Sequence, residues 1–172
     1  MLTHNFEDSN ELGKQGERII RDFLESFGGV ARYEDVSDNK EYQDKDIDGI
    51  LWTKKGRAIP VELKTDKYTT GNIFFETVSN LKYNTLGCMY KTQAEYLYYY
   101  FPNYRRMYCI PMNEYRQWVE EHKHEFPIQR VRNENKKTKQ IHYACGYLIP
   151  LEKLEEAFPH WRKFEMPYVK IT

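Results

Sequence analysis

Residues 46–64 read D-I-D-G-I-L-W-T-K-K-G-R-A-I-P-V-E-L-K, and this stretch decides the fold. Two apolar runs flank a polar turn at 53–57 that contains a glycine, which is the pattern of a β-hairpin. Because strand side chains alternate between faces, Glu62 and Lys64 point to the same side of the second strand. Asp48 on the partner strand completes a compact charged cluster. Such a cluster is costly beside a core unless something compensates, and a bound divalent cation is the usual compensation.

The spacing within this hairpin is more specific than any of its parts. A Glu-x-Lys element alone carries no signal, because an exposed Glu–Lys pair on a hairpin contributes little. Here an aspartate precedes that element by 14 residues, on an apolar strand joined to it by a turn. These residues resemble the PD-(D/E)xK nuclease superfamily: Asp48 stands at the motif aspartate, and Glu62-Leu63-Lys64 matches the (D/E)xK element. Ile47 stands where the motif has its proline.

The resemblance implies a fold. It is an α/β fold with a restriction-endonuclease-like αβββαβ core, a mixed central sheet flanked by helices, and a C-terminal α+β extension. The residue patterns fit this order, with a helix over 11–27, a strand over 30–36, the hairpin, a helix over 92–101 and a strand over 107–110. One added strand is expected at 72–78. We expect a single nuclease-like domain over 1–172, with the core at about 11–110 and the extension at about 111–172.

Glu17 lies on the first predicted helix, at the edge of its apolar stripe, while Lys14, Arg18 and Arg21 lie opposite that stripe. Helix geometry alone leaves open whether Glu17 is solvated or reaches a site beside the sheet. Many nucleases of the resembling superfamily carry a Gly-x-x-Gly-Glu-like first helix whose glutamate joins the metal site. Residues 13–17, Gly-Lys-Gln-Gly-Glu, match that pattern.

The resemblance also implies a chemistry. Mg²⁺ can activate water and stabilise a leaving oxygen in phosphodiester hydrolysis while bound through one or two carboxylates. The expected cofactor is Mg²⁺, with Mn²⁺ as a substitute, and the expected metal ligands are Asp48, Glu62, Glu17 and the backbone carbonyl near Leu63. Lys64 is expected to orient or help deprotonate the attacking water. The predicted catalytic residues are therefore Lys64, Glu62, Asp48 and Glu17.

Two further acids are open candidates. Asp46 lies two residues before Asp48 on the same face, as a rival or auxiliary ligand. Glu76 lies between aromatic and β-branched neighbours on the predicted strand at 72–78. The alternative for Glu76 is an acid on the solvent-exposed face of an edge strand. The five histidines show no ligand spacing, and Walker-type glycine loops are absent. Zinc, histidine catalysis and nucleotide phosphate loops are therefore not expected.

Charge balance limits how the chain can bind nucleic acid. It carries 26 basic and 26 acidic residues, so binding needs a local patch. The candidate phosphate contacts are a basic hairpin tip at 130–139 and an arginine pair, namely Lys136, Lys137, Lys139, Arg105 and Arg106. The expected partner is nucleic acid, with DNA preferred, and a homodimer is left open. Three widely spaced cysteines, no leader and no apolar run of roughly 18 residues favour a cytoplasmic protein without membrane contact.

The leading hypothesis is thus a metal-dependent nuclease that hydrolyses phosphodiester bonds in DNA. The alternative is a non-catalytic nucleic-acid-binding or protein-interaction module that retains the nuclease fold. The joint presence of Asp48, Glu62 and Lys64 argues against that module. A third class, a two-carboxylate enzyme such as a glycosidase, gives no role to Lys64. The substrate form, its sequence and endo- or exonucleolytic action stay open.

Overall fold

The computed structural model describes residues 3–134 and 138–168, with residues 3–10 described by their backbone alone. These residues form two compact units. The first unit contains residues 12–68, 92–115 and 161–168, and the second contains 3–11, 69–91 and 116–160. The expectation of a single domain stays a prediction. No helix in the described ranges is long and apolar enough to cross a membrane.

The first unit is built on a mixed six-stranded sheet with the order β11-β8-β7-β4-β3-β2. β4 and β7 pair in parallel, whereas every other neighbouring pair in this sheet is antiparallel. The prediction of an α/β fold with a mixed sheet and helices beside it is therefore confirmed. The strands are β2 (Val30–Asp35), β3 (Gly49–Thr53), β4 (Ala58–Thr65), β7 (Tyr96–Phe101), β8 (Arg106–Pro111) and β11 (Arg162–Glu165).

β3 and β4 form the predicted hairpin, with Gly49 opposite Val61 at its open end. Its turn contains Gly56 at a φ of 83°, a left-handed conformation that glycine adopts without steric cost. Asp48 precedes β3 by one residue, and its backbone N–H still donates to the Val61 carbonyl at 3.0 Å. The strand predicted at 30–36 is confirmed as β2.

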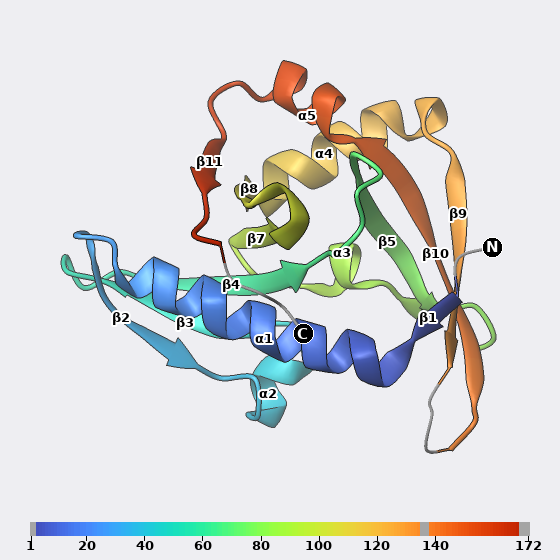
Figure 1. The fold of residues 1–172 in the computed structure, drawn as a ribbon, viewed down its shortest axis with the longest axis horizontal. Helices are drawn as coiled ribbons and strands as arrows, with labels where there is room; N and C mark the ends of the chain where they lie inside the picture. The colour runs from blue at the N-terminus through green and yellow to red at the C-terminus, as the bar shows by residue number, and fades with distance from the viewer. Residues whose placement is uncertain (1–2, 135–137, 169–172) are drawn as a thin grey trace. The chain divides into compact units, whose positions relative to one another are not determined.

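Helix α1 (Phe6–Glu25) lies alongside β2, β3 and β4 (Figure 1). Its apolar stripe supplies Ile20 and Leu24 to a core shared with Leu51, Val61 and Leu63. The helix approaches β4 closely, because a Cβ added at Gly16 would lie 1.8 Å from Thr65 Oγ1. The predicted start at residue 11 is wrong by about a turn and a half, since the capping-box pattern lies inside the helix.

The helix predicted at 92–101 is wrong. Residues Tyr96–Phe101 form β7, which lies between β4 and β8. Five of its six residues are buried. A strand with neighbours on both edges and both faces covered is a near-continuous apolar run without alternation, and aromatic residues suit it better than a helix. The strand predicted at 107–110 is confirmed as β8, whereas β11 has no counterpart in the prediction.

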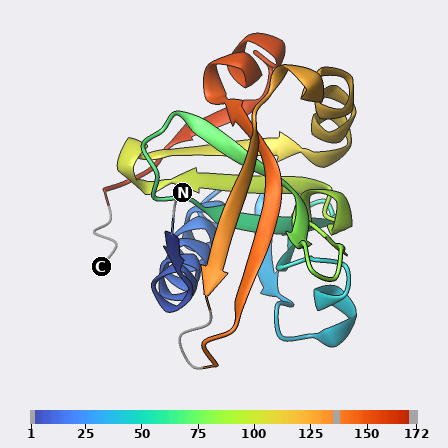
Figure 2. The ribbon, with the colours of Figure 1, turned by 90° about the vertical axis from the view of Figure 1, so that its right-hand side faces the viewer.

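The second unit carries a five-stranded sheet with the order β1-β9-β10-β5-β6, antiparallel except for the short β1–β9 pair. Figure 2 shows the long β9–β10 pair with β5 beside it. The strand predicted at 72–78 is confirmed as β5. The strands are β1 (Thr3–Asn5), β5 (Asn72–Asn80), β6 (Thr85–Leu86), β9 (Ile128–Glu134) and β10 (Ile141–Pro150). The remaining helices are α2 (Lys40–Gln43), α3 (Cys88–Lys91), α4 (Met112–His122) and α5 (Leu151–Ala157), with 3-10 turns at Pro102–Tyr104 and Lys123–Glu125.

Candidate active site

The candidate site lies in the first unit, where the β3–β4 ladder ends. Asp48 Oδ2 accepts a hydrogen bond of 2.8 Å from the backbone N–H of Leu63. Beyond the Gly49–Val61 pair, the side chain of Asp48 thus accepts the hydrogen bond that a backbone carbonyl would accept in a continued β3–β4 ladder. The N–H and C=O of one strand residue face the same neighbour, so the Leu63 carbonyl faces the β3 edge of β4 as well. The Asp48 carboxylate and the Leu63 carbonyl therefore lie on the same edge of β4.

Glu62 brings a second carboxyl group to the same place. Its exposed fraction is only 6%, and its carboxyl group lies within hydrogen-bonding reach of that of Asp48. Lys64 Nζ lies 3.7 Å from Glu62 Oε1, and 39% of the lysine side chain is exposed. Glu62 Oε2 is buried and accepts no hydrogen bond from any described residue. A buried carboxylate oxygen without a donor is costly, so this atom calls for an explanation.

The electrostatics of the pair follow from this burial. Burial raises the pKa of Glu62 well above its usual range; Lys64 opposes the shift, while Asp48 and Asp46 add to it. Burial likewise raises the pKa of Asp48, opposed by the Leu63 N–H and then by Lys64. Two close carboxyl groups in a dry site favour sharing a proton, whereas a bound divalent cation favours both in the ionised form.

Glu17 reaches this neighbourhood from α1. Burial is the largest cause that raises the pKa of Glu17, and the charges of Asp48 and Asp35 raise it further, while Lys64 lowers it. The structure thus places Glu17 within electrostatic range of Asp48 and Lys64, and Asp46 within electrostatic range of Asp48 and Glu62. Within the described ranges, however, no three His, Cys, Asp or Glu side chains are arranged to hold a metal ion. Metal ligation by Asp48, Glu62, Glu17 and the Leu63 carbonyl therefore stays a prediction.

A cavity of about 300 Å³ opens beside these groups. Its walls come from α1, from β2 and the loop that follows it, and from the two hairpin strands. The lining residues are Lys14, Glu17, Arg18, Arg21, Tyr33, Asp35, Ser37, Asp38, Asp48 and Leu63. Asp48 and Glu17 therefore face a space that a small molecule or part of a polymer can enter.

Tyr33 is a site residue that the sequence did not indicate. Its ring packs on Gly49, where an added Cβ would lie 2.1 Å from the phenol oxygen. Burial raises the pKa of Tyr33, and the charges of Asp48 and Asp35 add to the shift, so the hydroxyl stays protonated. It is a neutral donor at the cavity wall. A tyrosine on a half-buried strand does not by itself indicate a site residue. The glycine that follows Asp48 was the only feature of the sequence that pointed to a side chain packed there.

Glu76 is the other acid that the sequence left open as a site candidate. It lies on β5 in the second unit, and its Oε1 accepts a hydrogen bond of 3.2 Å from the backbone N–H of Cys88. That bond ties β5 to the start of α3. Glu76 therefore has a structural role that its sequence context did not distinguish from a site role.

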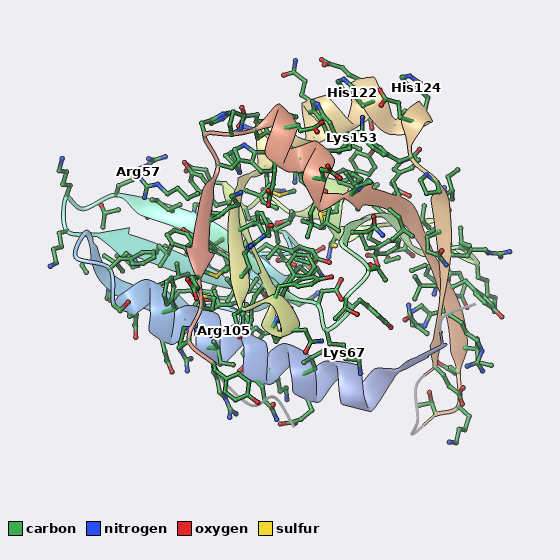
Figure 3. All side chains as sticks on the ribbon, turned by 45° about the horizontal axis from the view of Figure 1, so that its top comes forward. Arg57, Lys67, Arg105, His122, His124 and Lys153 are labelled. Carbon is green, nitrogen blue, oxygen red and sulfur yellow. The ribbon has the colours of Figure 1, made fainter. Side chains whose placement is uncertain are left out.

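The predicted phosphate contacts have different outcomes. Lys136 and Lys137 lie outside the described residues, and Lys139 is exposed between β9 and β10. Arg105, labelled in Figure 3, donates from Nε to the Met166 carbonyl at 3.2 Å and lies 3.5 Å from a Glu165 carboxylate oxygen. Arg106 is exposed at the start of β8. Arg105 thus already has partners within the first unit.

Comparisons with models of known protein families, with curated proteins and with solved structures found no match. The function is therefore inferred from the residues of the site.

Proposed function

We propose that this protein is a metal-dependent nuclease that hydrolyses phosphodiester bonds in DNA, with Mg²⁺ as cofactor and Mn²⁺ as a substitute. The observation that carries the proposal is the buried Glu62 carboxylate, which has one oxygen without a donor and lies against Asp48. Two buried acids that repel each other destabilise a fold in the absence of a counter-charge. Lys64 supplies part of that counter-charge, and a divalent cation would supply the rest.

The donor set suits a hard cation of this kind. Mg²⁺ prefers oxygen ligands, binds through one or two carboxylates and keeps several waters. Asp48, Glu62 and the Leu63 carbonyl provide three such oxygens, and the cavity beside them leaves room for water and substrate. A cation held there would polarise a phosphoryl oxygen and lower the pKa of bound water.

The side chains around these ligands have separate roles. The Lys64 ammonium orients the attacking water and offsets negative charge that develops on the phosphoryl oxygens. Glu17 lines the cavity together with Asp48, where its carboxylate would accept hydrogen bonds from water. Tyr33 lines the cavity, and its protonated hydroxyl would be a donor for a phosphate oxygen bound there. Burial keeps bulk water away from the Glu62 carboxyl group.

The order of elements supports a restriction-endonuclease-like core as part of this proposal. α1 is followed by the antiparallel strands β2, β3 and β4, and then by β7, which is parallel to β4. The chain departs from the αβββαβ pattern between β4 and β7. There β5, β6 and the short α3 stand in place of one core helix. A parallel pair needs a long crossover, and this insertion provides it.

A cleavage screen with variants tests the proposal. The purified protein is incubated with duplex, branched and single-stranded DNA and with RNA, each in Mg²⁺, Mn²⁺ or EDTA. Cleavage should require the metal and should be lost in Asp48→Ala and Glu62→Gln. Glu152→Gln on the exposed face of α5 and Lys67→Ala, labelled in Figure 3, are matched controls that should cleave like the parent. Nucleic-acid binding without cleavage in any metal would favour the non-catalytic module instead.

A further inference from the structure

The cavity beside the carboxylates has a cationic wall. Lys14, Arg18 and Arg21 of α1 line it together with Glu17. These positions are spaced i, i+4 and i+7 from Lys14, so they follow one face of the helix. That face lies opposite the apolar stripe, as the sequence predicts, but it borders the cavity rather than open solvent alone. Positive charge and the proposed metal ligands therefore border the same space.

The three cations are not equivalent. Arg21 lies 3.7 Å from carboxylate oxygens of both Asp22 and Asp35. Among the described residues, neither Lys14 nor Arg18 forms an ion pair, and both are exposed. Their positive charge is available to a ligand, whereas that of Arg21 is largely offset within the protein.

Acidic side chains line the same cavity. Asp35, Ser37 and Asp38 line it from the end of β2 and the loop that follows. Asp35 Oδ1 accepts hydrogen bonds from the backbone N–H and the hydroxyl of Ser37, so this loop holds its acid in a fixed position. A polyanion entering the cavity is therefore attracted to Lys14 and Arg18 and repelled by Asp35 and Asp38.

We propose that Lys14 and Arg18 bind successive phosphates of one nucleic-acid strand and hold it along α1, next to Asp48. The proposal rests on the proposed nuclease function and adds how the substrate lies. Two residues one helical turn apart are separated by about 6 Å along the axis, which is comparable with the spacing of successive phosphates. Contacts to phosphates fix the position of a strand without reading its sequence. The charges of Asp35 and Asp38 would repel the phosphates of a second strand, which favours a single strand as the ligand.

Salt dependence of binding tests this proposal apart from cleavage. The double variant Lys14→Ala/Arg18→Ala is compared with Lys54→Ala/Lys55→Ala, which removes two exposed charges from the hairpin turn. Binding of a fluorescent single-stranded oligonucleotide is measured over a series of salt concentrations, in EDTA and in Ca²⁺. Two lost phosphate contacts should flatten the slope of log K against log salt by about 1.4 in the first variant, and the control should keep the parent slope. A mononucleotide should compete poorly with the strand.

Each outcome separates the two proposals. A parent protein that binds the strand but cuts no substrate ends the proposed function and leaves the α1 contact standing. A parent protein that cuts, with unchanged KM and unchanged salt slope in the Lys14/Arg18 variant, ends the α1 contact and leaves the nuclease standing. A parent protein that binds no strand in either buffer also overturns the α1 contact, as does a mononucleotide that competes as well as the strand.

Discussion

The Asp48 carboxylate accepts a 2.8 Å hydrogen bond from the Leu63 backbone N–H. Asp48 is thus bonded directly to the middle residue of the Glu62-Leu63-Lys64 element. This bond joins β4 to the residue that precedes β3, at the point where backbone pairing between the two strands stops. It fixes the Asp48 side chain without using Glu62 or Lys64. The position of the candidate metal ligand is therefore built into the hairpin itself.

Removal of that acceptor should cost stability. In Asp48→Ala the Leu63 N–H loses its partner, and a buried donor left unsatisfied costs about 1–3 kcal/mol. Asp48→Asn keeps an oxygen that can accept the same bond while removing the charge. Denaturant unfolding in EDTA should therefore show a clear loss for the alanine variant and a smaller one for the asparagine variant. Equal losses in both variants would argue that charge, and not the hydrogen bond, holds Asp48 in place.

Glu62 should make stability depend on pH in the opposite sense to a paired acid. Its pKa is raised in the folded protein, so the folded state binds a proton more tightly than the unfolded state does. The contribution of Glu62 to stability should therefore be fully present below its ordinary pKa of 4.5. This contribution should be lost as the pH rises through the raised pKa of the folded state. Glu62→Gln should be more stable than the parent at neutral pH in EDTA. A parent stability that rises from about pH 5 to about pH 8 relative to this variant would contradict the assignment.

Mg²⁺ should reverse the loss of stability that Glu62 causes at neutral pH. A cation that binds the folded state alone raises its stability by mass action, and it competes with the proton shared by the two acids. Thermal unfolding of the parent should shift upward with added Mg²⁺, by more at higher pH. Glu62→Gln and Asp48→Asn should show little shift at the same concentrations. A shift that survives in both variants would place the cation elsewhere.

The contact between α1 and β4 should control the position of Glu17. In Gly16→Ala the new Cβ meets Thr65 Oγ1 at 1.8 Å, so the helix must move away from the strand. Overpacking of this kind costs about 1–3 kcal/mol, and Glu17 moves with the helix. Gly13→Ala is the matched control, because its Cβ meets no atom closer than Glu17 Oε1 at 3.9 Å. Gly16→Ala should lower both the free energy of unfolding and the cleavage rate, whereas Gly13→Ala should change neither. Unchanged values in Gly16→Ala would show that the position of the helix is not critical.

The hairpin and its site spacing could be predicted because they rest on local rules. Alternation places Glu62 and Lys64 on one face, and the turn glycine marks where the chain reverses. The run Tyr96–Phe101 follows no such rule, because a central strand buried on both faces loses its alternation and resembles a buried helix segment. β11 was missed since four exposed or half-exposed residues carry little pattern.

The cavity could not be predicted for a different reason. Lys14, Tyr33 and Asp38 come from separate segments, and only tertiary packing brings them around one space. Helix periodicity placed Lys14 and Arg18 on the correct face of α1 but could not show what that face borders. The partners of Arg105 likewise come from residues 165 and 166, far along the chain.

The most direct test of the central claim is the Mg²⁺-dependent cleavage rate of the parent protein beside Lys64→Ala. This variant keeps Asp48, Glu62 and the Leu63 carbonyl, so Mg²⁺ should still raise its unfolding temperature. Loss of the water-orienting ammonium should nevertheless lower the cleavage rate by about 10²- to 10⁴-fold, while Lys67→Ala cleaves like the parent. If the parent cuts no DNA or RNA substrate with Mg²⁺ or Mn²⁺, or if Lys64→Ala cleaves at the parent rate, the account of this site is wrong.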